Sequence, residues 1–491
     1  MNGPAKQSRK HGSQRLKLLA IVLFWLGVAG LALTASMPAR RVGGDSLGQA
    51  PVIPHNDPMT TRNDAGWVRT MSHEGTIDTS NAFFQSIGSN GRSCNTCHQQ
   101  AAAWSITPNE IRTRFDASDG NEPLFRRVDG SNSPLADVST EDARRVAYSM
   151  LLNRGVIRVG IGIPTGAEFT LTHVDDPYQY ASATELSLFR RPLPSTNLAF
   201  LTGIMWDGRE TITPFLPPMH AGQCTDALME ALIQQATSAT IGHAEGFEPT
   251  PEQLAEIVDF ETSLTTAQIT DDAAGMLNFD DALGGPRILS NQRFHVGIND
   301  TLGADPTGSL FNPTSMDLFA AWGTPTRISD PLGRARAAIA RGEQLFNHKP
   351  LSITDVGGLN DALEQDVISG TCSTCHNAPN VGNHSVALPL DIGLTDASRR
   401  TPDMPLYTLQ NNTTNEIVQT TDPGLALITG KWKDVGKFKG PILRALAARP
   451  PYFHNGFAAS LEEVVDFYDE RFAMNLNAQE KRDMVAFLRS L

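Results

Sequence analysis

The sequence predicts a mainly α protein with two helical domains and a small β-hairpin insertion. The chain has 491 residues, 40% of them hydrophobic, which indicates two or three domains rather than one core. A five-residue segment beginning at Cys94 recurs at Cys372, and helix-rich sequence follows both copies. Residues 156–163 alternate between apolar and polar side chains, and residues 169–174 also look extended, so together they predict the hairpin.

Both repeated segments read Cys-x-x-Cys-His, which is the attachment signal for a c-type haem. The two thiols bond to the haem vinyl groups, and the adjoining histidine ligates the iron from the proximal side. The sequence therefore predicts two covalent haems in two cytochrome c-like haem domains. Haem 1 is assigned to Cys94, Cys97 and His98, and haem 2 to Cys372, Cys375 and His376. A zinc site or a redox dithiol is the alternative for each segment.

The N-terminus combines basic residues with an apolar run over residues 18–35. This pattern predicts that residues 1–41 are either a signal peptide or an N-terminal membrane anchor. Because c-type haem is attached outside the cytoplasm, both features predict a periplasmic protein. The fifth cysteine, Cys224, has no partner left for a disulfide and is expected to be a buried thiol.

Charge becomes strongly negative after residue 41. Residues 1–41 hold seven Lys or Arg and no acidic residue, so 33 basic and 53 acidic residues remain, for a formal charge of −20. Such a surface repels nucleic acid and attracts basic partners, although it also simply keeps a protein soluble.

The expected order of parts follows from composition and helix signals. Residues 42–70 are rich in Gly, Pro, Asp and Asn and are predicted to be a linker. The first haem domain is assigned to 71–285, a loop-rich interdomain segment to 286–330, and the second haem domain to 331–491. Helices are predicted over 140–153, after Thr250, and after the capping boxes that begin at Ser460 and Asn477.

Several motifs from residue 80 to the C-terminus carry a family resemblance. Residues 205–209 read M-W-D-G-R, residues 438–444 read F-K-G-P-I-L-R, and residues 451–456 read P-Y-F-H-N-G. In this order they resemble the bacterial di-haem cytochrome c peroxidase family, which includes the MauG-type enzymes. The resemblance implies that haem 1 is peroxidatic and that haem 2 transfers electrons. It also implies that Trp206 carries electrons between the haems, and that Arg209 and Arg444 pair with haem propionates.

The resemblance further implies a distal group that handles protons beside haem 1. The family places a Gln and then a Glu after W-D-G-R, and here Gln235 and Glu245 have that spacing. Glu245 is the expected acid/base for splitting the peroxide O–O bond. His243 is the alternative, as acid/base or as iron ligand, and a surface cluster at a helix end is a third.

The sixth ligand of haem 2 distinguishes two branches of the family. Tyr468 stands fourteen residues after His454, where MauG-type enzymes have Tyr and the peroxidases have Met; Met474 follows six residues later. Tyrosinate would lower the potential, and Met would raise it. The family's interdomain calcium site is not expected, because Arg191 stands where that site uses Asn. His384 is expected at the surface or against a propionate, and no role is assigned to His295.

Three functions remain open. The first is periplasmic reduction of hydrogen peroxide, with electrons from a small periplasmic cytochrome c or copper protein. The second is MauG-like or rubber-oxygenase-like oxidation of a protein or organic substrate. The third is electron transfer without catalysis, which strong sixth ligands on both irons would favour.

Overall fold

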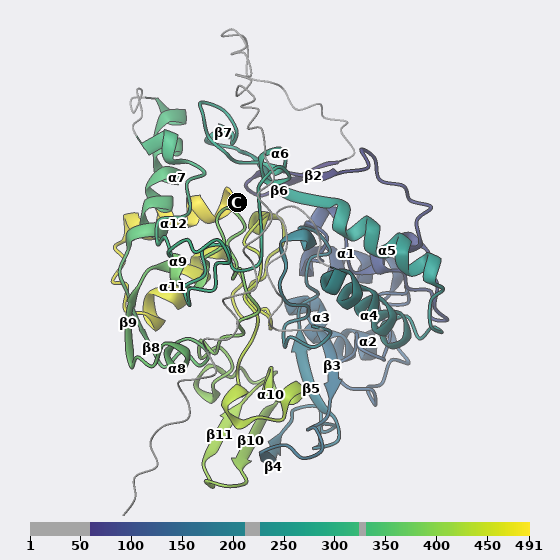
Figure 1. Ribbon diagram of the computed structural model, residues 1–491. Coiled ribbons are helices and arrows are strands. Elements are labelled where there is room, and N and C mark those ends of the chain that lie inside the picture. The colour runs from purple at the N-terminus through teal and green to yellow at the C-terminus, as the bar shows by residue number, and fades with distance from the viewer. Residues whose placement is uncertain (1–58, 212–225, 324–329) are drawn as a thin grey trace, which may run out of the picture. The chain divides into compact units, whose positions relative to one another are not determined.

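The computed structural model describes residues 59–211, 226–323 and 330–491 (Figure 1). The predicted signal or anchor, the first part of the predicted linker and Cys224 lie outside these residues. Within the described ranges, no helix is both long enough and apolar enough to cross a membrane.

The described residues contain many helices, several of them a single turn. They are α1 Pro108–Ser118, α2 Glu141–Ala147, α3 Ser149–Arg154, α4 Asp226–His243, α5 Pro251–Ser263, α6 Pro286–Leu289, α7 Pro331–His348, α8 Asn360–Leu363, α9 Cys372–Cys375, α10 Ala426–Thr429, α11 Leu461–Arg471 and α12 Ala478–Arg489. The strands are β1 Thr60–Asn63, β2 Gly66–Ser72, β3 Ile157–Ile161, β4 Phe169–Asp175, β5 Leu186–Arg190, β6 Leu264–Asp271, β7 Gly275–Met276, β8 Leu351–Thr354, β9 Val367–Gly370, β10 Leu406–Asn411 and β11 Ile417–Thr420.

The sheets correct the predicted fold class. The strands of the described residues form four sheets, in the orders β1-β2-β6-β7, β11-β10-β4, β3-β5 and β8-β9. The mainly α prediction therefore underestimated the β content, because most of these strands are short and two of the pairings, β2–β6 and β4–β10, join segments distant in the chain. Such pairing leaves little trace in local sequence.

The predicted β-hairpin is wrong in its pairing. Both strands exist, but β3 pairs with β5 and β4 pairs antiparallel with β10, more than 200 residues later. Figure 1 shows β4 beside β10 and β11. Phe169 at the start of β4 is buried with Tyr407 and Leu409 of β10, and this shared apolar cluster selects the distant partner.

The predicted linker also contains ordered strands. Residues 60–72 form β1 and β2, joined by a turn in which the Asn63 side chain accepts hydrogen bonds from the backbone N–H groups of Ala65 and Gly66, both at 3.0 Å. β2 then pairs with β6. An Asx turn of this kind supplies the reversal that a hairpin needs.

The predicted helix starts are largely confirmed. Thr250 caps α5 in a capping box with Gln253, and Asn477 does the same for α12 with Glu480. Ser460 caps α11, but the predicted capping box does not form. The Glu463 carboxylate accepts a hydrogen bond from the Ala459 N–H and not from the Ser460 N–H. The helix predicted over 140–153 divides at Tyr148 into α2 and α3.

The largest core gathers α7, α11 and α12, which lie together in Figure 1. It buries Ile339, Phe346 and Phe487 from these helices, and it also includes Ala274 and Leu277 from the segment assigned to the first domain. The cores around the first Cys-x-x-Cys-His segment are separate and smaller. The chain therefore shares one apolar core across the predicted boundary at residue 285.

Candidate functional site

The first Cys-x-x-Cys-His segment forms a tight turn that exposes its thiols to a cavity. Cys94 begins a short 3₁₀ helix, and the His98 N–H donates to the Cys94 carbonyl at 3.1 Å. The His98 Nδ1 atom lies 3.1 Å from the Trp104 carbonyl and 3.0 Å from Ser195 Oγ. Burial lowers the pKa of His98 to about 4, so its ring is neutral at pH 7, as an iron ligand requires.

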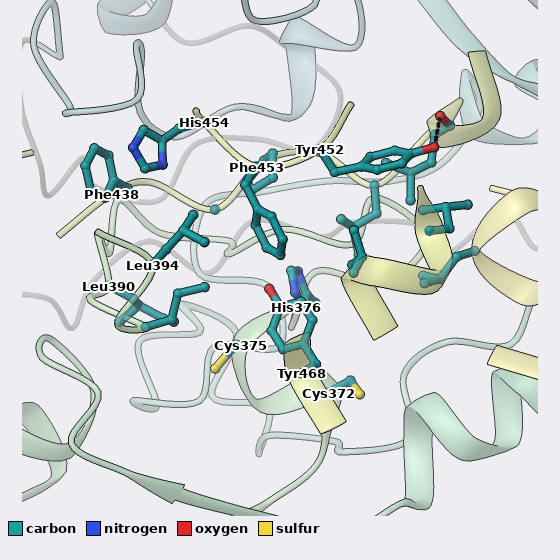
Figure 2. Close-up of a pocket in the computed structure, with 18 of the residues that line it drawn as sticks. Cys372, Cys375, His376, Leu390, Leu394, Phe438, Tyr452, Phe453, His454 and Tyr468 are labelled. Carbon is teal, nitrogen blue, oxygen red and sulfur yellow. Dashed lines mark hydrogen bonds between the residues drawn. The ribbon is translucent and has the colours of Figure 1, made fainter. Parts of the chain in front are cut away.

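The second segment repeats this arrangement at α9. The His376 N–H donates to the Cys372 carbonyl at 3.0 Å, and its Nδ1 atom contacts the Gly382 carbonyl. Burial lowers the pKa of His376 to about 4. Figure 2 shows Cys372, Cys375 and His376 facing the same cavity as Tyr468 and Phe453. In both segments, a hydrogen bond at Nδ1 leaves Nε2 available to a metal.

Each segment lines its own large cavity. The first cavity, about 1510 Å³ with its opening to solvent included, contains Cys94, Cys97 and His98. The second, about 1670 Å³ on the same measure, contains Cys372, Cys375 and His376. The walls of the two cavities have five residues in common, namely Arg191, Pro192, Pro194, Trp206 and Lys439. The two cavities are therefore neighbours.

Trp206 is held firmly in this shared wall. Its side chain is 9% exposed, and its indole N–H donates to the Arg191 carbonyl at 2.8 Å. Its ring lies 6.2 Å from the His454 ring, which stacks on Phe438 with the ring centroids 4.0 Å apart. Figure 2 shows this stacked pair at the edge of the second cavity. His454 is a site residue for which the sequence analysis gave only a motif and no role.

A buried charge cluster fixes the backbone next to Trp206. Arg190 pairs with Asp207 and, at 2.8 Å, with Asp422; all three side chains are almost fully buried. Arg209 also contacts Asp207, at 2.7 Å, and lines the first cavity. Burial alone would raise the pKa of Asp207, but the Arg190 and Arg209 guanidiniums outweigh it and hold that pKa below its usual range.

The structure separates the residues predicted for proton transfer. Gln235 and His243, both on α4, line the first cavity. The His243 Nδ1 atom lies 2.6 Å from Asp129 Oδ2, and Asp129 in turn pairs with Arg92 at 2.5 Å. Asp129 therefore orients the imidazole, and the sequence analysis missed it because it lies 114 residues from His243.

Glu245 does not line this cavity. Its backbone turns to a left-handed φ of 50° just after α4 ends, and its exposed carboxylate accepts a hydrogen bond from Asn90 at 3.1 Å. The expectation that Glu245 is the acid/base beside haem 1 does not agree with this position. The chain reversal after His243 removes Glu245 from the face that α4 presents to the cavity.

Tyr468 and Met474 both line the second cavity. The hydroxyl of Tyr468 has no hydrogen-bond partner among the described residues, and burial raises its pKa. His384 lines the same cavity and is 4% exposed, so the expected surface position is wrong. Neither ring nitrogen of His384 has a partner in the described part of the chain.

The residues present fit a covalently attached haem in each cavity. Arg191, Arg449 and Lys439 line the second cavity, and none of them pairs with a carboxylate in the described ranges. Burial lowers their pKa values to about 9, 10 and 8. Buried cations that lack a carboxylate partner favour the binding of an anionic group, such as a haem propionate. Arg444 is buried but lines neither cavity, so its predicted propionate contact stays a prediction.

The described residues give no support to the zinc alternative, because no group of three or more His, Cys, Asp or Glu side chains among them could hold a metal ion. His295 contacts Asp305 at 3.3 Å within a loop and lines neither cavity. No disulfide joins any of the four cysteines of the two segments.

Glu261 is a further residue that the sequence analysis missed. It lies on α5, is 5% exposed and lines the first cavity. Burial raises its pKa to about 7. The signal was present in the sequence, because Glu261 follows Leu254, Ile257 and Val258 at helical spacing on the apolar face of α5.

Comparison with known proteins shows similarity over about a quarter of the chain. An alignment of 140 positions, which covers 24% of the chain, is 35% identical to a cytochrome-c peroxidase of Pseudomonas sp. (strain SCT). Another alignment, of 145 positions and 27% of the chain, is 31% identical to the cytochrome c551 peroxidase of Nitrosomonas europaea. Each match spans 36% of the relative's own length. These relatives are oxidoreductases, and they confirm the family resemblance.

Among solved structures, one neighbour is a MauG-like protein associated with microbial copper homeostasis. It shares 16% identity with a TM-score of 0.38, and the alignment covers 90% of this chain and 95% of that chain. No family model matches the sequence.

Proposed function

We propose that the protein is a periplasmic di-haem peroxidase that reduces hydrogen peroxide at the first cavity, with electrons that enter through the second. The observation that carries this proposal is the position of Trp206, whose ring lies in the wall common to both cavities. The similarity to named cytochrome-c peroxidases supports the same activity.

When bound, haem supplies the redox chemistry of peroxide reduction. Two electrons and two protons convert one hydrogen peroxide into two water molecules, with cleavage of the O–O bond. The Cys94 and Cys97 thiols would hold the group in the first cavity, and Cys372 and Cys375 would hold it in the second. His98 and His376 present neutral rings of the kind that ligate iron.

His243 is the group that we assign to proton transfer. Its imidazole lines the first cavity, and Asp129 accepts the Nδ1 proton, so the Nε2 atom is free to take a proton from one peroxide oxygen and return it to the other. Gln235, two helical turns earlier on α4, can orient peroxide by a hydrogen bond.

Trp206 relays electrons from the second cavity to the first. The indole is buried, fixed by its hydrogen bond to Arg191, and in edge contact with His454. A rigid aromatic side chain in a wall shared by two cofactor sites shortens the distance that an electron must cross through saturated groups. The formal charge of −20 after residue 41 suits a small basic electron carrier as the donor.

A MauG-like oxidation of a protein or organic substrate is a second candidate, favoured by one observation. The Tyr468 hydroxyl lines the second cavity without a hydrogen-bond partner in the described residues, which suits ligation of iron by tyrosinate. Tyrosinate lowers the potential of an iron centre, which suits oxidation of a substrate more than electron entry from a carrier.

The test uses the full chain loaded with both haems. We expect hydrogen peroxide to drive oxidation of a reduced small basic cytochrome c, and we expect the oxidised protein to show a high-spin ferric EPR signal that peroxide converts. In Trp206→Phe the rate of cytochrome oxidation should fall sharply while that high-spin signal still responds to peroxide.

Trp432→Phe is the matched control, because Trp432 lies in the β4–β10–β11 region and lines neither cavity. Its rate should equal that of the unmodified protein. Two low-spin signals, inert to peroxide even after one-electron reduction, would reject both enzyme functions and leave electron transfer. Peroxide consumption without oxidation of any small carrier, but with oxidation of an added protein substrate, would favour the MauG-like activity.

A further inference from the structure

Trp104 is a buried tryptophan that the proposed function does not use, and its backbone contacts the first site. Its side chain is 1% exposed, and its carbonyl lies 3.1 Å from His98 Nδ1. When Nε2 of a histidine ligates iron, Nδ1 keeps its proton and donates it, so the Trp104 carbonyl is the acceptor. The backbone of Trp104 has a left-handed φ of 61°, which is rare for a bulky residue. The surrounding structure therefore holds this tryptophan firmly beside His98.

Aromatic rings enclose the Trp104 indole. Phe83, Phe84 and Phe260 contact it edge-on, with ring centroids 5.9, 6.5 and 5.4 Å from its own. Phe83 also lies 6.4 Å from the His98 ring. The indole is therefore linked to the proximal histidine both through the backbone and through a neighbouring ring, and this apolar cage keeps water away from it.

The indole N–H begins a chain of buried hydroxyl groups. It donates to Thr70 Oγ1 at 2.9 Å, and β2 and β6 place Thr70 opposite Thr266, with the two Oγ1 atoms 2.9 Å apart. Thr266 Oγ1 lies 2.8 Å from Thr196 Oγ1. None of the three threonines is more than 2% exposed, and Thr196 belongs to the wall of the first cavity. An indole N–H only donates, and each hydroxyl accepts one hydrogen bond and donates one, so the chain runs from Trp104 to the first cavity.

Trp206 differs from Trp104 in this respect. The Trp206 N–H donates to the Arg191 carbonyl, and a peptide carbonyl has no proton of its own to pass on. Trp206 therefore keeps its proton when it relays an electron, whereas the hydroxyl next to Trp104 can accept a proton and release another.

We propose that Trp104 is a second redox-active tryptophan, which supplies one electron and one proton to the first cavity during peroxide reduction. The inference rests on the proposed function and adds a source of electrons to it. The Nε1–H bond of Trp104 breaks, and the electron passes to the first site by way of His98. The proton moves to Thr70, and the hydroxyl protons of Thr70 and Thr266 each move on by one hydroxyl. Thr196 delivers its proton to an oxygen atom in the first cavity, and Trp104 becomes a neutral indolyl radical.

The electrons and protons of this step balance. One hydrogen peroxide takes up two electrons and two protons to become two water molecules. Trp104 provides one of each, the carrier provides the other electron through Trp206, and solvent provides the other proton. A further electron from the carrier and a further proton from solvent then restore the Trp104 N–H bond. Because a small carrier delivers electrons singly, Trp104 lets the reduction of peroxide finish before the second electron arrives.

The experiment mixes the full, haem-loaded chain with one equivalent of hydrogen peroxide in the absence of a carrier, and records EPR spectra after rapid freezing. We expect a radical whose hyperfine splitting narrows when the protein contains ring-deuterated tryptophan, and which is lost in Trp104→Phe. Trp322→Phe is the matched control, because Trp322 is also buried, at 3% exposed, but lines neither cavity. The radical should persist in Trp322→Phe and in Trp206→Phe.

Loss of the indole proton has a readout of its own. A neutral indolyl radical has no exchangeable N–H proton, so its spectrum is the same in H₂O and D₂O, whereas the spectrum of a cation radical narrows in D₂O. We expect the neutral radical in the unmodified protein and its loss in Thr70→Val and Thr266→Val, which keep a β-branched side chain in each strand. Thr265→Val is the matched control, because Thr265 is buried on β6 beside Thr266 and is not part of the chain. It should keep the neutral radical.

A radical that persists in Trp104→Phe, or that is lost equally in Trp322→Phe, would overturn the proposal, as would a spectrum that narrows in D₂O. Thr70→Val keeps the proposal testable if Trp104→Phe does not fold, since it retains the indole. An organic peracid, used in place of hydrogen peroxide, separates this inference from the proposed function. A Trp104 radical with the peracid but not with hydrogen peroxide would reject the proposed function alone. Oxidation of the haem absorption bands by either oxidant, without a tryptophan radical, would overturn the inference alone.

Discussion

At the scale of single residues, position relative to the first cavity distinguishes the two candidates for proton transfer. His243 and Glu245 are two residues apart, yet His243 lines the first cavity and Glu245 is exposed outside it. The Asp129 carboxylate, itself anchored by Arg92, holds the His243 ring. An oriented imidazole is a typical general acid/base, and an exposed carboxylate is not positioned for that role.

These two residues therefore allow a direct comparison of the rates of two variants whose substitutions lie only two positions apart. In His243→Ala we expect the rate of peroxide reduction to fall by about 10²–10⁴-fold, the range for loss of a general acid/base. In Glu245→Ala the rate should stay unchanged. Stopped-flow kinetics with hydrogen peroxide measures both, and an equal loss in the two variants would contradict our assignment.

The sixth ligand of haem 2 is a second question at this scale. We expect Tyr468→Phe to alter the EPR spectrum and raise the reduction potential of haem 2, because it removes the partnerless hydroxyl in the second cavity. Met474→Leu is the matched variant, since Met474 is buried in the same cavity. If only Met474→Leu changes the spectrum, Met474 is the ligand and the potential of haem 2 is that of an electron-entry site.

At the scale of elements, α5 shows how a local capping sequence positions a residue in the wall of the first cavity. Its start is set by Thr250, Pro251 and Gln253, and its apolar face carries Glu261 to the first cavity. Because the N-cap fixes where the helix begins, it also sets which residues face the first cavity. A weakened cap should therefore lower the stability of the protein and disturb the position of Glu261 in the cavity wall.

We expect Thr250→Ala to lower the free energy of unfolding by about 1 kcal/mol, since it removes a capping hydrogen bond to the Gln253 N–H. Thr113→Ala is the control, because Thr113 is exposed on α1 and its hydroxyl only bonds the Asn109 carbonyl within the helix. Chemical denaturation followed by circular dichroism measures the difference. Equal effects of the two substitutions would show that the cap contributes nothing specific.

At the scale of the whole molecule, a buried ion cluster joins the two halves of the chain. Arg190 at the end of β5 contacts Asp207 in the first half and Asp422 in the second. The β4–β10 pairing and the Arg154–Asp403 ion pair at 2.8 Å join the same halves nearer the surface. The shared wall that contains Trp206 therefore depends on contacts between residues more than 200 positions apart.

Arg190→Met should destabilise the protein by about 3–5 kcal/mol, because it leaves buried carboxylates without their main partner. Lys481→Met removes two ion pairs, to Asp466 and Asp469, in which the lysine is partly exposed to solvent, and we expect a far smaller effect. Denaturation of the haem-loaded protein compares the two. Similar stabilities would mean that the cluster does not hold the halves together.

The sequence alone determined the features that local chemistry specifies. Both Cys-x-x-Cys-His segments form tight turns beside cavities, and the caps at Thr250 and Asn477 start helices, because these features depend on residues within a few positions of one another. The family resemblance of the M-W-D-G-R motif predicted that Trp206 carries electrons between two haems, and in the structure Trp206 lines both cavities.

Only the tertiary structure decided which distant residues meet. The partner of β4 lies on β10, Asp129 orients His243, and Ser195 contacts His98, although each pair is separated by at least 97 positions in the chain. No local pattern encodes such pairings, because burial of whole apolar faces selects them. Glu245 illustrates the same limit, since one left-handed residue after α4 moved it from the expected site to the surface.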